Sequence, residues 1–208
     1  MNLKFIKQIV HTEMSGKRSA PYKEIGDKYT HGERTAVLAL RLRRLLLPND
    51  SSHDNILTVA AWFHDIRNGT ANHCILGAEY TRELLAGHVT TDELEHICNI
   101  IAVHDDRSPD NIYKNIIKIH QDADHLDHFG TLDIWRCVAH TTGQDRTMKD
   151  ALEFFHDVRP NESIRWRSEL HFDLSKRIFD DRERYMRSFI ERFTVEATGG
   201  IWNEEVLI

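Results

Sequence analysis

The dipeptide His-Asp occurs four times in this chain, and one occurrence is placed to do chemistry. His64 and Asp65 directly follow five apolar residues, 59–63, so both are attached to a segment that the fold must bury. Burying a carboxylate beside an imidazole is costly unless a cation balances the charge. Both groups are good ligands for a divalent cation, and adjacent residues can reach one ion together. We therefore predict that His64 and Asp65 bind a metal ion.

The other three His-Asp dipeptides stand in different settings. Residues 53–54 follow two serines at the expected start of a helix, where such side chains commonly act as caps. Asp105, the partner of His104, leads into a polar loop, and the fourth dipeptide is at 156–157. Only His64-Asp65 has both members attached to a fully apolar helix, so the metal is assigned to that pair.

Helical periodicity runs through most of the chain, and no strand-like alternation of useful length occurs. Thr30 is the expected N-cap of the second helix, and Thr90 with Glu93 forms a capping box that opens the fifth. We therefore predict an all-α fold. The predicted helices are residues 4–14, 30–47, 53–65, 73–86, 91–104, 112–127, 131–142, 148–158 and 163–193.

Composition narrows the class of protein. A chain of 208 residues with 40% hydrophobic content suits one domain, predicted here over 1–208. The net charge of −6 argues against a general nucleic-acid-binding surface. No apolar run is long enough to cross a membrane, and no secretory leader is expected at the N-terminus. Three dispersed cysteines without CxxC spacing support neither a disulfide framework nor a cysteine zinc site, so we expect a cytoplasmic protein.

Further candidate ligands lie on other predicted helices. His31 is on the apolar face of the second helix, His73 begins the fourth, and His104 ends the apolar face of the fifth. Taken singly, His31 is also explained as a capped, satisfied histidine near a helix start. His73 and His104 are also explained as histidines at the edge of the core that bond a backbone carbonyl. Asp122 and Asp124 flank the apolar stripe of the sixth helix on opposite sides, and periodicity alone does not decide which of them faces the site.

The order of these residues resembles the HD-domain superfamily. The match consists of His31 on an early helix, the pair His64 and Asp65 ending an apolar helix, and Asp124 in an Ala-Asp-x-Leu setting. The resemblance favours Asp124 over Asp122 as the fourth metal ligand. The flanking sequences are similar too, with YTHGER at 29–34 and AAWFHDI at 60–66.

The resemblance implies a bundle of α-helices that holds the metal between them. It covers about residues 25–140, so residues 141–208 are expected to form additional helices that pack on this core. It also implies hydrolysis of a phosphate ester or anhydride in a small phosphorylated metabolite, commonly a nucleotide, by water that the metal activates at His64 and Asp65. His and Asp ligands suit Mn²⁺, Fe²⁺, Co²⁺, Ni²⁺, Zn²⁺ or Mg²⁺, and neither the metal nor the oligomeric state is determined by the sequence.

Basic residues near the ligands are candidates for binding the substrate's phosphate. Arg34 follows His31 by three residues, and Arg67 follows Asp65 by two. Solvated surface charge is the alternative for both. Asp127, one turn beyond Asp124, either orients a ligand or the attacking water, or forms a salt bridge at the end of its helix.

Some members of the superfamily hold two metals, and His73 and His104 stand where the additional ligands occur. Such a dinuclear site opens a second reaction class, because a few dinuclear relatives are iron oxygenases. A third possibility is a metal or ligand sensor without turnover. The sequence departs from the cyclic-dinucleotide phosphodiesterases, since Asp105 replaces a second histidine and their Gly-Tyr-Pro signature is absent.

Overall fold

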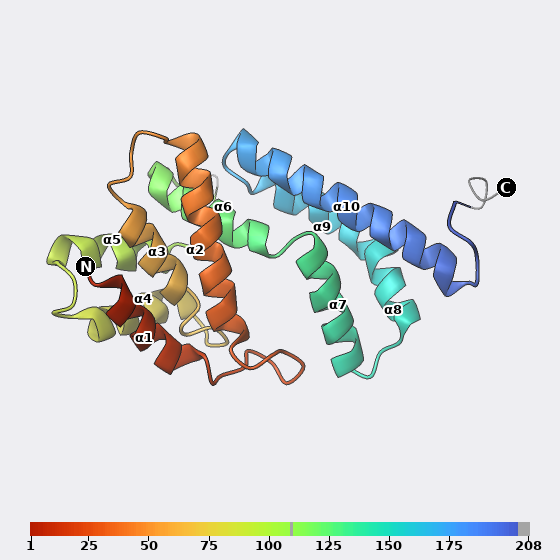
Figure 1. The fold of residues 1–208 in the computed structure, drawn as a ribbon, viewed down its shortest axis with the longest axis horizontal. Coiled ribbons are helices and arrows are strands. Elements are labelled where there is room, and N and C mark those ends of the chain that lie inside the picture. The colour runs from red at the N-terminus through yellow and green to blue at the C-terminus, as the bar shows by residue number, and fades with distance from the viewer. Residues whose placement is uncertain (109, 204–208) are drawn as a thin grey trace.

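The computed structural model describes residues 1–108 and 110–203, and these residues form helices without any strand. The predicted all-α class is therefore confirmed, although residue 109 and the final five residues of the predicted domain lie outside the described part. Figure 1 shows α1–α6 gathered at one end of the molecule and α7–α10 extending from them. The helices are α1 (Leu3–Met14), α2 (Asp27–Leu46), α3 (Asp54–Phe63), α4 (His73–Leu85), α5 (Thr91–Ala102), α6 (Asn115–Asp127), α7 (Thr131–Gly143), α8 (Met148–Glu153), the π-helix η1 (Phe154–Val158), α9 (Arg159–Ser168) and α10 (Asp173–Ala197).

Helix α2 begins one turn earlier than the sequence predicts. Gly26, with a positive φ of 75°, occupies the N-cap position, and Thr30 lies inside the helix with its hydroxyl donating to the carbonyls of Gly26 and Asp27. Glycine adopts this backbone conformation without steric cost. The helix therefore begins after Gly26, without a side-chain hydrogen bond at its N-cap. His31 consequently lies in the second turn of α2 and is buried.

A close approach of α2 to α3 sets the position of His31. A Cβ atom at Gly32 would lie 2.9 Å from the carbonyl oxygen of Ala61 and 3.1 Å from that of Trp62. Only glycine therefore allows the two helices to meet this closely. The contact holds His31 beside His64, which is the C-cap residue of α3.

Two apolar clusters hold this helical core together. The first joins α1, α3, α4 and α5, and the second joins α2, α3, α6 and α10. The cluster members nearest the site include Phe63 and Leu57 on α3, and Ala123 and Leu126 on α6, all fully buried. The end of α3 and the middle of α6 therefore have little freedom to move, and the polar residues attached to them are held firmly.

The beginning of α6 differs from the prediction. The helix starts at Asn115 instead of residue 112, and Ile112 is 96% exposed in the segment before it. Ile112 stands at the helical spacing of the apolar stripe, but no element of the described part of the chain covers it. The capping box predicted at Thr90 and Glu93 is present and opens α5.

The predicted long helix at 163–193 is two helices, which corrects the sequence interpretation. Helix α9 ends at Ser168, and α10 begins at Asp173. The buried carboxylate of Asp122 accepts hydrogen bonds from the backbone N–H groups of His171 and Phe172, at 2.9 and 3.1 Å. These two bonds stabilise the break by replacing the hydrogen bonds that a continuous helix would make.

Pro160 does not end a helix, as the sequence predicts, but lies in the first turn of α9. The expected helix at 148–158 was to stop before Pro160, but the chain continues through the π-helix η1 into α9, with Pro160 in the first turn of α9. Proline is well tolerated there because the first N–H groups of a helix lack intrahelical partners. Within residues 1–108 and 110–203, no helix combines the length and apolar character that crossing a membrane requires.

Candidate metal centre

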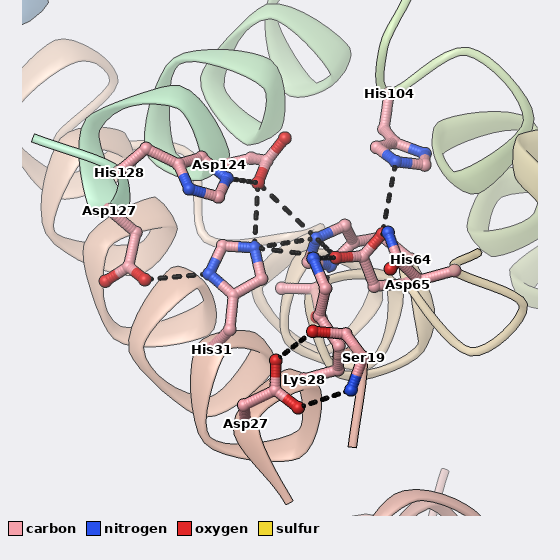
Figure 2. A network of polar contacts seen from close by, with 12 residues as sticks. Ser19, Asp27, Lys28, His31, His64, Asp65, His104, Asp124, Asp127 and His128 are labelled. Atoms are coloured by element: carbon pink, nitrogen blue, oxygen red, sulfur yellow. Dashed lines mark hydrogen bonds and ion pairs between the residues drawn. The ribbon is translucent and has the colours of Figure 1, made fainter. Parts of the chain in front are cut away.

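Three helices bring four of the predicted ligands to one point. His31 Nε2 lies 3.1 Å from His64 Nε2 and 3.0 Å from Asp124 Oδ1, and His64 Nε2 lies 3.4 Å from the same oxygen of Asp124. Asp65 Oδ2 is 3.9 Å from His31 Nε2 and 3.7 Å from His64 Nε2. Figure 2 shows these side chains pointing toward one another, and all four are buried.

The outer ring nitrogens of both histidines are hydrogen-bonded to acceptors. His31 donates from Nδ1 to Asp127 Oδ2 at 2.7 Å, and His64 donates from Nδ1 to the Ala61 carbonyl at 2.8 Å. A carbonyl or carboxylate oxygen only accepts, so each Nδ1 carries the hydrogen and each Nε2 presents its lone pair to the cluster. Histidines that bind metals are usually held in this way.

Lone pairs of two imidazoles and a carboxylate oxygen repel one another at these distances. Either a proton or a metal cation must therefore lie among them. Burial by itself would lower the pKa of His31, but its hydrogen bonds with Asp124 and Asp127 outweigh burial and raise the pKa to about 9. Such a strong attraction for positive charge is what a cation-binding site requires.

The carboxylates of the cluster are held ionised in spite of their burial. Burial would raise the pKa of Asp65, but the nearby His64 and Lys28 lower it far below its usual range. Lys28 Nζ forms an ion pair with Asp65 Oδ2. The pKa of Asp124 is likewise lowered strongly, because His64, His128 and His31 outweigh its burial. Lys28, whose side chain is 24% exposed, was not singled out from the sequence.

Asp127 and Arg34 support the cluster from one side. The Arg34 guanidinium donates to both carboxylate oxygens of Asp127, with its Nη2 2.8 Å from Oδ2. Asp127 in turn accepts from His31. Asp127 forms the predicted type of salt bridge, here with Arg34, and it also contacts the predicted ligand His31, so orientation of that ligand stays a prediction. Arg34, a predicted phosphate contact, has its guanidinium engaged in this chain of bonds.

The structure shows which of Asp122 and Asp124 faces the candidate site, which periodicity alone did not decide. Asp124 lies in the cluster, whereas Asp122 points toward the junction of α9 and α10 and accepts from the backbone there. Both are buried, so burial alone would not distinguish them.

A pocket of about 400 Å³ opens beside the cluster, between the segment around 19–28, α2 and α7. His31, Asp127 and His128 are at its inner wall, and four basic side chains line it: Lys23, Lys28, Arg34 and Arg136. Arg67, the other predicted phosphate contact, is not part of the lining. Its guanidinium lies over the ring of Tyr80, with Cζ 3.7 Å from the ring centroid, in a cation–π contact.

The two histidines considered for a second ion also lie near Asp65. His73 Nε2 is 3.8 Å and His104 Nε2 is 3.9 Å from Asp65 Oδ1, the carboxylate oxygen that is not paired with Lys28. His104 is buried after the end of α5, and its Nδ1 donates to the Ile101 carbonyl at 2.7 Å.

Two histidines of the site were missed in the sequence. His128 Nε2 lies 3.6 Å from Asp124 Oδ1, and the fully buried His120 packs beside the His64 ring, with centroids 5.4 Å apart. Within the described part of the chain, neither ring nitrogen of His120 has a hydrogen-bond partner. The signal was available, because His120 and His128 stand four residues before and after Asp124 and so share its face of the helix.

The comparisons with known proteins agree with this fold. No family model and no curated protein matches the sequence. Among solved structures, an HD-superfamily hydrolase from Bacillus thuringiensis is 22% identical, covers 95% of this chain and 99% of its own, and gives a TM-score of 0.65. YpgQ from Bacillus subtilis is 20% identical, and the match covers 92% of this chain and 94% of YpgQ with a TM-score of 0.64. A structure of YpgQ in complex with ADP is also 20% identical, and the match covers 91% of this chain and 94% of YpgQ with a TM-score of 0.63.

The chain therefore has the fold of the HD superfamily, and the resemblance found in the sequence is confirmed at the level of the fold. That fold here encloses a cluster of His and Asp side chains compatible with a metal ion. One of these structural neighbours, the protein from Bacillus thuringiensis, is named an HD-superfamily hydrolase.

Proposed function

We propose that this protein is a metal-dependent phosphohydrolase acting on a small phosphorylated metabolite, a nucleotide in the first instance. His31, His64, Asp65 and Asp124 would hold the metal. The observation that carries the proposal is the convergence of His31 Nε2, His64 Nε2 and Asp124 Oδ1, each within 3.4 Å of the other two. A divalent cation bound there supplies a nucleophile from water at neutral pH and draws charge off phosphoryl oxygens.

The basic lining of the adjoining pocket supports a phosphorylated substrate. Burial lowers the pKa of Lys23, and the neighbouring Arg136 lowers it further, so a bound anion would stabilise the charged form of Lys23. The acidic side chains of Glu24, Asp27 and Asp127 also line the pocket. Lys28 lies both in the pocket and against Asp65, where it can bind a phosphate beside the metal ligands. Phosphate oxygens form strong charge-assisted hydrogen bonds with such groups.

Two features favour a nucleotide over a smaller phosphate ester. The pocket volume of about 400 Å³ is within the range of roughly 300–1,000 Å³ that is usual for small-molecule sites. Tyr22 and Trp135 line the pocket, and the Trp135 side chain is exposed, so aromatic faces are available for a base to stack on. The structural neighbour YpgQ has been solved in complex with ADP, which is consistent with this choice.

The remaining residues of the cluster have positioning roles in this proposal. Asp127 fixes the His31 ring and its hydrogen, and Arg34 holds Asp127 in turn. The Ala61 carbonyl fixes His64 in the same way. These bonds keep both Nε2 atoms directed at the metal during turnover, which avoids the cost of reorganising the ligands.

The test is a panel of nucleoside mono-, di- and triphosphates incubated with the protein and Mn²⁺, with products separated and quantified by anion-exchange chromatography. We expect release of phosphate or pyrophosphate from at least one nucleotide, and loss of this release in Asp124→Asn. Asp122→Asn is the matched control, because it lies two residues away and contacts the α9–α10 junction. It should keep its metal and its turnover, even if its melting temperature falls.

Two outcomes would contradict the proposal and favour the alternatives raised by the sequence. Tight metal binding without release of phosphate from any member of the panel would favour a sensor. Oxygen consumption by the iron-loaded protein would favour a dinuclear oxygenase, and it should then depend on His73 and His104.

A further inference from the structure

A second pocket opens between the end of α2, the beginning of α3, the middle of α5 and the beginning of α6. Its volume is about 290 Å³, and the candidate metal ligands do not line it. Four parts of the helical core thus meet here without filling the space between them. Because the interior of a protein is close-packed, a hollow of this size beside the core is a place that a small molecule can occupy.

The inner wall of this second pocket is apolar. Six aliphatic side chains line it: Leu47, Leu57, Ile100, Ile116, Ile117 and Ile119. Four of them belong to the buried core, whereas Leu47 and Ile116 are half-buried and present apolar surface to the pocket. An apolar cavity of ~150 Å³ already accommodates a benzene ring. The second pocket therefore has room for an aromatic ring together with a short aliphatic chain.

The rim of the second pocket is polar and carries positive charge. Lys114, the N-cap residue of α6, lies exposed at this rim. The rings of His53 and His96 lie beside each other there, with centroids 5.6 Å apart. Arg43 also lines the pocket, but its guanidinium donates to both carboxylate oxygens of Asp54, at 2.6 and 2.5 Å. Lys114 is therefore the cation at the rim that a bound ligand can engage.

The beginning of α6 adds to this positive potential. Within the described part of the chain, the Lys114 side chain makes no capping hydrogen bond, and the first turn of α6 contains no acidic residue. The first N–H groups of a helix lack intrahelical partners and attract an anion. Asn115 and Ile116 of this turn line the pocket. The carboxylate of the lining, Asp50, accepts from the backbone N–H and the hydroxyl of Ser52 at 3.1 and 2.6 Å, so its charge is already engaged.

The second pocket is distinct from the metal centre, although it adjoins the same two helices. Leu57 stands seven residues before His64, and Ile117 stands seven residues before Asp124. Seven residues are two turns, or about 10 Å along a helix. A molecule in the second pocket therefore contacts α3 and α6 without reaching the metal ligands.

We propose that the second pocket binds a small monocarboxylate with an apolar body, such as an aryl-alkanoate or a short fatty acid. Its carboxylate lies at Lys114 and the beginning of α6, and its apolar body lies against the leucine and isoleucine wall. The inference goes beyond the proposed function, because this site shares no residue with the metal centre and binds its ligand whether or not the protein hydrolyses a phosphate.

The test is a titration of the ¹⁵N-labelled protein in Mg²⁺ buffer with 4-phenylbutyrate, followed by ¹H–¹⁵N NMR. We expect saturable shifts that are largest at the backbone N–H groups of Asn115 and Ile116. The neutral 4-phenylbutanamide has the same apolar body and should bind about tenfold more weakly or worse, because it lacks the charge. Acetate keeps the charge but lacks the apolar body, and it should bind at least about a hundredfold more weakly.

Variants of the lining locate the bound carboxylate. Lys114→Glu should lower the affinity for 4-phenylbutyrate by about tenfold or more. Lys118→Glu is the matched control, because Lys118 lies one turn later on α6 and is not part of the lining. Asn99→Trp places an indole in the pocket from its exposed rim and should abolish binding. Circular dichroism establishes that each variant is folded.

Asp124→Asn separates this inference from the proposed function. The variant should lose its metal and its turnover, but it should bind 4-phenylbutyrate with the affinity of the wild type. Retained binding in this variant therefore supports the second pocket even if no nucleotide is hydrolysed by the wild type.

Three results would overturn the inference. They are the absence of saturable shifts with 4-phenylbutyrate, equal affinity for 4-phenylbutyrate and its amide, and unchanged binding in both Lys114→Glu and Asn99→Trp. Binding that is lost in Lys23→Glu instead would place the carboxylate in the pocket beside the metal centre, which Lys23 lines.

Discussion

The protein buries charge in two places, and the two places are built differently. In the candidate metal centre, Asp65, Asp124 and Asp127 are buried with several histidines around them. The second place lies between α7, α9 and α10, where Arg159 and Glu183 are buried. Asp133 Oδ2 lies 2.9 Å from Arg159 Nη2. In the candidate metal centre, the lone pairs of His31, His64 and Asp124 converge on one point. In the second region, the guanidinium of Arg159 is the cation that pairs with the carboxylates.

The Arg159 guanidinium has both ionic and aromatic partners, although its Nε and Nη1 have no hydrogen-bond partner among the described residues. Arg159 Nη2 lies 2.8 Å from Glu183 Oε1, and Ser163 donates to Glu183 Oε2 at 2.5 Å. The guanidinium also lies 4.5 Å from the centroid of the Trp166 ring. Arginine suits such a place because its planar group can pair with carboxylates and stack on an aromatic ring together.

The response of the carboxylates to burial separates the two regions. Burial raises the pKa of Asp133, and the attraction of Arg159 and Arg136 does not overcome it. At Asp65 and Asp124 the neighbouring histidines do overcome burial, and the pKa falls. In the Arg159 network a guanidinium lies between the carboxylates of Asp133 and Glu183, so its contacts serve the fold. In the candidate metal centre the lone pairs of His31, His64 and Asp124 converge on one point, which makes this region the candidate for binding a cation. Four predictions test this distinction.

The largest effect is expected for Asp65→Ala. Removing this carboxylate takes away a ligand of the first centre, and turnover should fall by roughly a thousandfold or more. Helix content should stay close to that of the wild type, because Asp65 lies in the turn after α3. Steady-state kinetics and circular dichroism measure the two quantities. Unchanged turnover at full metal occupancy would contradict the assignment of the site.

Arg159→Met should affect stability and leave the metal in place. Breaking a buried ion pair leaves Glu183 uncompensated, at a cost of about 3–5 kcal/mol in the free energy of unfolding. Urea unfolding of the metal-free proteins measures this cost, and elemental analysis measures the metal. Arg167→Met is the matched control, because Arg167 and Asp180 form an ion pair in which both side chains are 47% exposed. That change should cost no more than about 1 kcal/mol. Equal losses in the two variants would remove the distinction between the buried and exposed networks.

Asp127→Asn should weaken metal binding while it preserves the fold. The asparagine retains an acceptor for His31 but loses the negative charge, so the imidazole becomes a poorer ligand. We expect a loss of about 10- to 100-fold in metal affinity, measured by competition with a chromogenic chelator. Asp180→Asn, at an exposed ion pair, is the control. If metal affinity did not change, Asp127 would serve only to pair with Arg34.

The smallest effect is a pH dependence at Asp133. A carboxyl group whose pKa is raised in the folded state contributes stability below its unfolded pKa, and loses it as the pH rises through the folded value. The wild type should therefore lose stability relative to Asp133→Asn as the pH rises from about 4 toward neutrality. Urea unfolding across this interval measures the difference. A difference that grew in favour of the wild type would show that Arg159 dominates over burial at Asp133.

The sequence determined the helices and much of the site. Helical periodicity and the capping box gave the all-α class and the start of α5, and the apolar segment before His64 and Asp65 placed this pair at a buried helix end. It also placed His31 on an inward face of α2. These features depend on interactions within a few residues, which a local pattern contains.

Only the tertiary structure decided which groups meet. His31 and Asp124 are 93 residues apart, and their contact requires α6 to pack beside α2. The close approach of α2 to α3 at Gly32 then places His64 beside both residues. The packing of helices also places Cys74 in contact with Asp105. It places Asp122 at the break between α9 and α10, where its carboxylate accepts from the His171 backbone. Periodicity tells which side of a helix is buried, but the partner on that side is selected by the close packing of helices that are distant in the chain.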